Sequence, residues 1–459
     1  MATERPNILW LMTDEQRCDS LGCYGAEWAH TPNIDALARE GAVFGAAVTP
    51  APVCVPARTS ILAGKYPCRT GVWHNSIDLK APVPNLMGRF RDAGYLTASF
   101  GKQHYGGRGS AFDTESGPCL SEHVHYFRYP EQYDESRHDV VKYPGDIYNW
   151  IFGGRFPAPA EETAEAQVVG KATEWLDAEG RSCPLFLRVS FNGPHTPVVP
   201  PEPFDRIVDA DAVKLPAEAE EMPEGSPRWL DEELSKCASA APLSGEQIRK
   251  MRGYYYGEVA FLDSLFGRLL DGMRERGLLD NTIVVYCSDH GTHLGDFGLV
   301  QKQTFFEPVV NVPFIWWYPS GIAGGARFRT PVETQSMLPT LLELAGLEAP
   351  GAGYSPSLAS CLSNGREPEQ RPVFSEFTLA SFAPHTKHDR PLVMVRDGEW
   401  KLSGCFDSDV SDLVLYDLER DPHERRNLAE DPASRQQRDR LLALVSAHLQ
   451  GESTNVGVT

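Results

Sequence analysis

The chain has 459 residues, 41% hydrophobic and 10% aromatic, which is typical of a globular protein with a sizeable core and suggests about two or three domains. Its 63 acidic and 43 basic residues give a formal net charge of −20, which excludes binding to nucleic acid or anionic membranes through bulk charge. No segment reaches the roughly 18 consecutive apolar residues that span a membrane, and an anionic ligand would have to be bound by a local cluster of cations.

Four short apolar segments predict buried strands, and each leads directly into polar residues. In chain order the segments are 8–12, 96–100, 185–191 and 283–287. The polar residues that follow them are, in the same order, Asp14; Lys102 and His104; His195; and Asp289 with His290. Helical patterns occur between these segments, at 31–41 and 246–277. The alternation predicts an α/β fold with a large mixed, mostly parallel sheet flanked by helices, whose ligands collect at the carboxyl ends of the strands.

A second prominent feature is the motif Cys54-Val-Pro56-Ala-Arg58. Pro56 fits the first position of a helix that Gly64 can close. Cys54 is then expected at the helix N-terminus, where free N–H groups and the helix dipole favour an anion, with the guanidinium of Arg58 beside it. A thiolate phosphatase encloses its phosphate in a longer loop between cysteine and arginine, so that class does not fit. The motif alone leaves a buried structural cysteine as the alternative.

The character of the chain changes after Pro368. Short apolar segments at 372–377, 392–396, 400–402 and 413–417 predict a small antiparallel sheet, followed by a terminal helix over about 433–449. We therefore expect a catalytic α/β domain over 1–366 and a C-terminal subdomain over 367–459. The stretch 200–243 is rich in Pro, Ala, Glu and Asp and indicates an acidic surface excursion with little regular structure, a lid or an interface.

The Cys-x-Pro-x-Arg motif resembles the signature of the sulfatase family, the formylglycine-dependent enzymes of the alkaline phosphatase superfamily. Other segments resemble further elements of that family, in the family's order. They are 6–16, 101–106, 193–197, 288–291, 299–307 and 415–428. The resemblance therefore runs from residue 6 to about residue 430.

The resemblance implies one divalent cation bound by Asp14, Asp289 and His290, with the group at position 54 against it. Glu15 stands where many members carry a second aspartate, and we expect it to be a ligand as well. Carboxylate ligands favour Ca²⁺, our first choice, or Mg²⁺, and the imidazole of His290, where many members carry asparagine, leaves Mn²⁺ open.

The resemblance also implies that Cys54 is oxidised after synthesis to formylglycine, an aldehyde. In the family its hydrate attacks sulfur, and the second hydroxyl then expels sulfate by regenerating the aldehyde. Arg58, Lys102 and Lys302 are expected to neutralise charge on the sulfate oxygens. The expected activity is hydrolysis of sulfate esters.

Histidines complete the expected site. The resemblance points to His195 as the general acid for the leaving oxygen and to His104 as support for the hydrated aldehyde, two roles that could be exchanged. His74 follows the nucleophile helix and is expected to contact the substrate. His123 and His125 have chelating spacing, but without further ligands they do not predict a second metal site.

Two alternatives to a sulfatase remain at this point. A phosphonate monoester or phosphodiester hydrolase uses the same aldehyde, metal and cations. A catalytically inactive homologue that acts as a binding protein would lack Cys54 or Lys102, and both are present. Sulfated sugars, choline-type esters and aryl sulfates are all open as substrates, although the C-terminal tail of the choline-specific relatives is not recognisable here.

The expected partners are a small-molecule or saccharide sulfate ester and the formylglycine-generating enzyme, which acts on the unfolded chain. No nucleic acid or membrane partner is expected, and a homo-oligomer is left open. Ten cysteines without a pattern and an N-terminal segment without an export signal predict reduced thiols, Cys18 and Cys23 included, and a cytoplasmic location.

Overall fold

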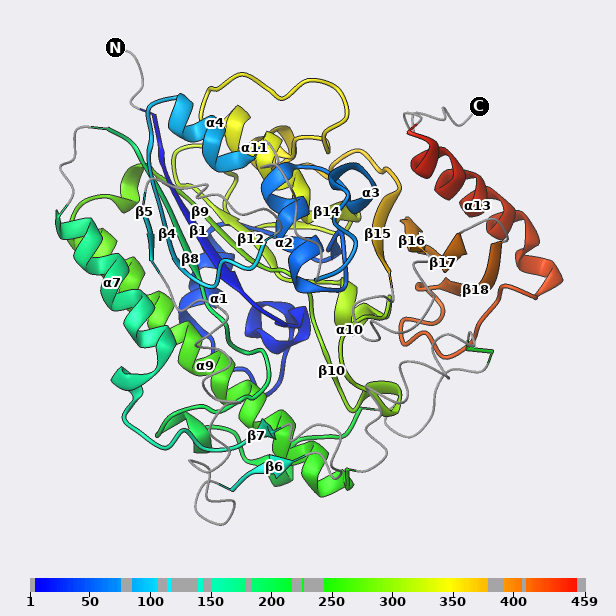
Figure 1. The fold of residues 1–459 in the computed structure, drawn as a ribbon, viewed down its shortest axis with the longest axis horizontal. Helices are drawn as coiled ribbons and strands as arrows, with labels where there is room; N and C mark the ends of the chain where they lie inside the picture. The colour runs from blue at the N-terminus through cyan, green and yellow to red at the C-terminus, as the bar shows by residue number, and fades with distance from the viewer. Residues whose placement is uncertain are drawn as a thin grey trace.

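An eight-stranded sheet forms the centre of the fold (Figure 1), with the strand order β13-β2-β12-β9-β1-β8-β4-β5. The computed structural model of the chain describes residues 5–75, 85–105, 114–116, 139–142, 151–178, 183–216, 225–226, 243–378, 391–406 and 410–451. The strands in sheet order are Ala326–Phe328, Ala42–Phe44, Phe314–Trp317, Thr282–Ser288, Asn7–Thr13, Leu185–Ser190, Leu96–Gly101 and Thr114–Ser116.

The four predicted strands are the central ones, β9, β1, β8 and β4, and they are parallel to one another. Met12 near the end of β1 is paired with Ser190 of β8 and with Cys287 of β9, and Gly101 of β4 is paired with the same Ser190. Because β12 runs antiparallel to both β9 and β2, the sheet is mixed. The predicted mixed, mostly parallel sheet is confirmed. Because the four central strands are parallel and in register, their carboxyl ends lie side by side.

Helices cover both faces of the sheet because successive side chains of a strand point to opposite faces. Leu9 and Leu11 of β1 belong to the same apolar cluster as residues of α1 (Pro32–Glu40), α7 (Ala164–Ala178) and α9 (Gly245–Glu275). Ile8, Trp10 and Met12 belong to the cluster on the other face, with α2 (Cys54–Ala63), α4 (Leu86–Asp92) and α11 (Met337–Leu344). The helices predicted at 31–41 and 246–277 are confirmed as α1 and α9.

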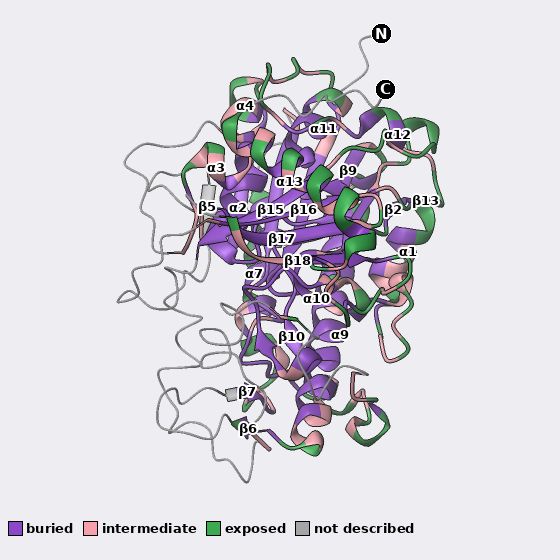
Figure 2. Ribbon diagram, turned by 90° about the vertical axis from the view of Figure 1, so that its right-hand side faces the viewer, coloured by how far each residue is buried: buried purple, intermediate pink, exposed green. Residues whose placement is uncertain are grey.

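A four-stranded antiparallel sheet, β15-β16-β17-β18, forms the C-terminal part. Its strands are Val373–Thr378, Pro391–Asp397, Trp400–Phe406 and Val410–Asp417, followed by α13, Arg435–Gln450. One face packs on α13 and the other on residues around the start of α2. Figure 2 shows the strands buried beneath α13, whose outer side is exposed. The antiparallel sheet and terminal helix are confirmed, whereas the boundary between 366 and 367 stays a prediction.

A buried ion-pair network joins this sheet to the α/β part. Glu307, the first residue of α10 (Glu307–Val310), accepts hydrogen bonds from Arg396 at 3.0 Å and from Lys401 at 2.8 Å. Lys401 also pairs with Glu424 at 2.6 Å, and its side chain is only 2% exposed. Because a buried cation with two carboxylates cannot be separated without leaving charge unpaired, the network fixes the two parts together.

The acidic excursion is only partly described. Its described portion up to residue 216 holds two short 3₁₀ turns, Phe204–Arg206 and Ala210–Ala212, in agreement with little regular structure. Residues 217–224 and 227–242 lie outside the described residues, and a role as a lid or interface stays a prediction. Among the helices that the structure describes, none combines the length and the apolar character needed to cross a bilayer.

Candidate active site

Helix α2 places Cys54 and Arg58 at the carboxyl edge of the large sheet. All ten of its residues are buried, and it ends at Gly64, whose φ of 66° is the left-handed conformation that glycine adopts readily. The helix begins at Cys54, so the predicted position of Pro56 as its first residue is wrong by two places. Proline is tolerated there because N–H groups of the first turn have no partner within the helix. Another N–H of the first turn, that of Val55, donates to Oδ1 of Asn75 at 2.9 Å.

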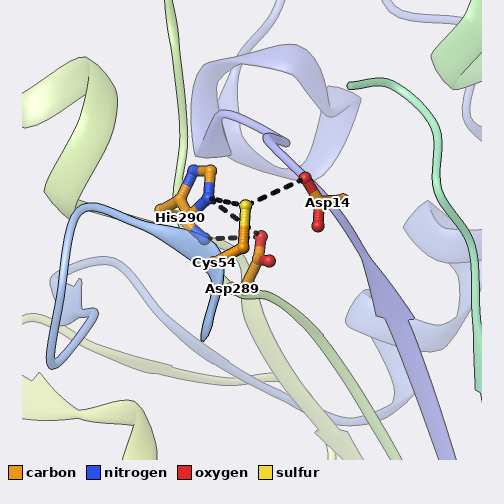
Figure 3. Close-up of side chains that lie close together, drawn as sticks. All are labelled: Asp14, Cys54, Asp289 and His290. Atoms are coloured by element: carbon orange, nitrogen blue, oxygen red, sulfur yellow. Dashed lines mark hydrogen bonds and ion pairs between the residues drawn. The ribbon is translucent and has the colours of Figure 1, made fainter. Parts of the chain in front are cut away.

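Four predicted ligands meet at the start of α2 (Figure 3): Asp14 from the end of β1, Cys54, and Asp289 and His290 from the end of β9. Nε2 of His290 lies 3.2 Å from Sγ of Cys54, which lies 3.8 Å from Oδ1 of Asp14. One candidate ligand atom from each residue lies within 4.8 Å of all the others, and all four side chains are buried. The strand-end clusters separated along the sequence therefore do form one site.

Arg58 holds the two aspartates in place. Its Nε donates to Oδ2 of Asp289 at 2.6 Å, and its Nη2 donates to Oδ2 of Asp14 at 2.7 Å. A third nitrogen, Nη1, donates to Oγ of Ser190 at 3.0 Å. With both Oδ2 atoms bound, Oδ1 of Asp14 is left facing Cys54. The rigid guanidinium fork thus sets the orientation of two carboxylates at once.

Two lysines add positive charge next to Cys54. Lys102, from the end of β4, pairs through Nζ with Oδ2 of Asp14 at 2.6 Å. Lys302 lies with Nζ 3.2 Å from Sγ of Cys54 and forms an ion pair with Glu15. Both lysines are almost completely buried, so their charges are weakly screened by solvent.

Glu15 lies next to the four-residue cluster, and its backbone N–H donates to Oδ1 of Asp289 at 3.2 Å. Its Oε1 pairs with Lys302 and lies 3.2 Å from Nε2 of His195, and together with Asp14 and His195 it forms a second group of candidate ligands. Its backbone has a φ of 62°, an uncommon value for a residue with a side chain. Oε2 is buried and accepts no hydrogen bond from the described residues. Whether Glu15 is a metal ligand stays a prediction.

The remaining predicted histidines lie around this centre. His104 is half-buried in the described segment after β4. Desolvation of its ring, followed by the charge of Lys102, lowers its pKa well below the usual value. His74 is half-buried in the segment after α3 (Pro67–Thr70), and its contact with substrate stays a prediction. His123 and His125 lie outside the described residues.

The charges of the site act strongly on Cys54. Burial and the nearby Asp14 oppose ionisation of the thiol, but Lys302, Lys102 and His290 outweigh them and lower its pKa to about 6. The atom at this position is therefore stabilised as an anion, and the same field would stabilise an oxyanion there.

The imidazole of His290, next to Cys54, has its pKa shifted in the opposite direction. Burial disfavours the imidazolium of His290, but the negative charges of Asp289 and Cys54 outweigh it and raise its pKa to about 9. Its Nδ1 lies 2.9 Å from the carbonyl oxygen of Gly291, which can only accept, so Nδ1 carries a proton and Nε2 faces Cys54.

The charges of this centre fit a bound divalent cation. Three side chains are formally positive (Arg58, Lys102, Lys302) and three are formally negative (Asp14, Glu15, Asp289). The anionic sulfur of Cys54 balances the imidazolium of His290, so these side chains together leave no positive surplus. Carboxylate and imidazole donors in one buried cluster are a suitable ligand set for a divalent ion. A bound ion would supply the surplus that an anionic substrate requires.

One contributing residue was missed from the sequence. Ser190 ends β8 between β1 and β4, and its hydroxyl accepts from Arg58. A buried arginine needs several acceptors, and that requirement was the signal that points to a polar residue on the neighbouring strand end.

The site is that of a hydrolase for anionic esters, and comparison with known proteins defines the family. Residues 6–347 match the Sulfatase family profile, and residues 295–450 match the profile described as N-sulphoglucosamine sulphohydrolase, C-terminal. The chain therefore belongs to the sulfatase family. Membership assigns the hydrolysis of sulfate esters as its activity, and it implies a metal ion and formylglycine.

Individual relatives agree with this assignment over most of the chain. A choline-sulfatase of Rhizobium meliloti (strain 1021) is 32% identical over 456 residues, covering 94% of this chain and 84% of the relative. An arylsulfatase of Clostridium perfringens (strain 13 / Type A) is 27% identical and covers 97% of this chain and 95% of the relative. The crystal structure of a phosphonate monoester hydrolase of Agrobacterium radiobacter has a TM-score of 0.82 at 26% identity, with 97% and 96% of the two chains covered.

Proposed function

We propose that this chain hydrolyses sulfate esters with formylglycine made from Cys54, in a centre that also holds one divalent cation. The observation that carries the proposal is the position of Cys54 Sγ. It stands at the N-terminus of α2 within 3.2 Å of both Lys302 Nζ and His290 Nε2 and faces Asp14. Sγ marks the place that an oxygen of the hydrated aldehyde would take.

The ligands proposed for the cation are Asp14, Asp289 and His290, with Ca²⁺ as the first choice and Mg²⁺ or Mn²⁺ as alternatives. When bound, the ion supplies Lewis-acid charge neutralisation at the sulfate group. Formylglycine supplies a hydrated carbonyl with two hydroxyl groups in place of the thiol.

The cationic side chains bind and orient the sulfate group. Lys102 follows β4 and Lys302 follows β11 (Val300–Gln301), and Arg58 holds the carboxylates of Asp14 and Asp289. Their arrangement exists before substrate arrives, because each of the three is already held by an ion pair. Charge that develops on the sulfate oxygens is then met by groups that need not reorganise, which is the main source of electrostatic catalysis.

We infer that His195 holds a proton for the leaving oxygen. Its Nδ1 lies 2.7 Å from the carbonyl oxygen of Thr196, which fixes a proton on Nδ1 and turns Nε2 toward Oε1 of Glu15. Burial raises the pKa of Glu15, although Lys302 opposes the shift. The pair can therefore keep a proton between His195 and Glu15, and the His195 side chain, at 15% exposure, is the more accessible of the two to a leaving group.

A phosphonate monoester hydrolase is the second candidate, because a solved structure of that kind covers nearly the whole chain. It would use the same residues, so the two activities differ only in the atom attacked. The relatives named choline-sulfatase and arylsulfatase favour sulfate. Because one relative is named choline-sulfatase, choline sulfate stays among the proposed substrates, with aryl and saccharide sulfates.

The decisive experiment joins mass analysis to turnover. Peptide mapping of active protein is expected to show position 54 with its sulfur replaced by a carbonyl oxygen, and Cys54→Ala is expected to abolish turnover of an aryl sulfate. Cys361→Ala, at another buried cysteine, should retain activity. Active protein with an intact thiol at position 54 would contradict the formylglycine step. Faster turnover of an aryl phosphonate than of the aryl sulfate would favour the second candidate.

A further inference from the structure

A further group of candidate metal ligands shares no residue with the two groups at the active site. Cys68 is in α3, Glu376 is in β15, and His448 is near the end of α13. One ligand atom of each lies within 4.8 Å of the other two. Figure 1 shows the three elements together on the right of the molecule, where the C-terminal sheet meets the α/β part.

The three side chains are held in orientation by their surroundings. The ring of Phe374 stacks on His448 with centroids 3.8 Å apart and planes 8° apart, and Tyr66 contacts the ring edge-on at 4.8 Å. The N–H of Cys68 donates to Oε2 of Glu376 at 2.7 Å, which leaves Oε1 in contact with Nε2 of His448. These contacts fix the orientation of the imidazole ring by packing and that of the carboxylate by a backbone hydrogen bond.

The distance between the cysteine sulfur and the histidine nitrogen suits an ion with tetrahedral coordination. Sγ of Cys68 and Nε2 of His448 are 3.7 Å apart. Zn–S and Zn–N bonds of about 2.3 and 2.0 Å at a tetrahedral angle place the two atoms about 3.5 Å apart. Oε1 of Glu376 is closer to Nε2 and has to move outward to take a third ligand position. One thiolate, one imidazole and one carboxylate form a donor set that binds zinc rather than calcium.

Charge and access also favour an ion here. The carboxylate of Glu376 is fully buried, and His448 is the only basic side chain among the described residues that forms an ion pair with it. A buried carboxylate needs a firm positive partner. A cavity of about 540 Å³, lined by Tyr66, Arg69 and His448 among others, reaches the His448 side chain, so an ion could approach the group from that side.

We propose that Cys68, Glu376 and His448 form a second metal site, for Zn²⁺ or a similar transition-metal ion, that fastens α13 and β15 to α3. Binding replaces the proton of the Cys68 thiol by the metal, and the proton is released to solvent. The site is separate from the active site and serves docking of the C-terminal part rather than the hydrolytic step.

The test uses Co²⁺, whose bond to a thiolate gives a charge-transfer absorption in the near ultraviolet. Cys54 is itself a candidate ligand, so the full-length Cys54→Ala variant is the background, with excess Mg²⁺ present to occupy the oxygen-rich active site. We expect Co²⁺ titration to produce the thiolate band with about one ion per chain, and Zn²⁺ to remove it by displacement.

Two further substitutions locate the sulfur ligand. In the Cys54→Ala background, Cys68→Ser should lose the band, whereas Cys183→Ser, at another partly exposed cysteine, should keep it. Zn²⁺ should raise Tm in the background protein but not in the Cys68→Ser variant. A background protein without the band, or a band that survives Cys68→Ser, would overturn the proposal. If Cys68→Ser does not fold, as judged by circular dichroism, the background titration with the Cys183→Ser control decides alone.

Discussion

Replacing Arg58 by lysine tests whether one guanidinium organises the active site. Arg58 is fully buried and donates four hydrogen bonds, to Asp289 at 2.6 Å, to Asp14 at 2.7 Å, to Ser190 at 3.0 Å and to the carbonyl oxygen of Lys102 at 3.3 Å. Lysine keeps the charge but presents a single nitrogen. It cannot bridge both aspartates, so either Asp14, which still pairs with Lys102, or Asp289 loses its contact with position 58.

The expected loss follows from that count. Removing one partner of a buried ion pair costs about 3–5 kcal/mol. Unfolding entropy is about 2 cal/mol/K per residue, so for 459 residues the loss corresponds to a decrease in Tm of roughly 3–5 °C. A divalent cation at the same aspartates would replace part of the missing charge. Ca²⁺ should therefore recover some of the loss in Tm, while turnover stays low because the carboxylates are no longer fixed.

The assay is thermal unfolding of wild type and Arg58→Lys with and without saturating Ca²⁺. The control is Arg435→Lys, which changes an arginine that is 76% exposed and pairs with Asp439 only at 3.6 Å. That exposed change should shift stability by less than about 0.5 kcal/mol. An Arg58→Lys protein with wild-type Tm and turnover would refute the assignment of Arg58 as the organiser of both aspartates.

Three other predictions address the ion, a buried acid pair and the junction between the two parts. Chelation is expected to lower turnover by about 10²-fold or more, since losing one charge-stabilising donor already costs that much. Burial, and then the charge of Glu165, raise the pKa of Glu258 well above its usual value. Above about pH 4.5 the unfolded chain loses this proton while the folded chain retains it, so the stability of wild type should fall. Glu258→Gln should not show this loss of stability. Lys401→Met leaves Glu307 and Glu424 without their shared cation and should cost about 3–5 kcal/mol.

Each of these has a direct readout. Re-addition of Ca²⁺, Mg²⁺ or Mn²⁺ after chelation identifies the ion that restores turnover, and full activity in the chelated protein would remove the ion from the reaction. Tm of Glu258→Gln should equal that of wild type at pH 4 and exceed it at pH 8, and a constant difference would contradict the shifted acid. For Lys401→Met, urea unfolding should show a lower midpoint, and an unchanged midpoint would mean that the network does not join the two parts.

The central strands and the polar residues after them were predictable because each signal is local. An apolar segment followed at once by Asp14 or Asp289 fixes both the strand and the edge at which the acid lies. The short strands β2, β12 and β13 at the other side of the sheet gave no comparable signal, because a strand of three or four residues shows no periodicity of its own.

Pairings between distant residues could not be predicted in the same way. The contact of Glu15 with His195 and Lys302, and that of Cys68 with His448, depend on how separate elements are brought together in three dimensions. The start of α2 was misjudged for a related reason. Proline at the third helical position is as acceptable as at the first, and only the extended conformation of Val53 determines where the helix begins.

The burial of Cys54 has a consequence for timing during synthesis. Its neighbour His290 follows 236 positions later, and the thiol is only 1% exposed once both are in place. At about 5–20 residues per second, a ribosome needs roughly 10–50 s to add the intervening chain. If Cys54 is oxidised as proposed, the oxidising enzyme would have that interval, before β9 and the following His290 are made, in which the thiol is not yet covered by them.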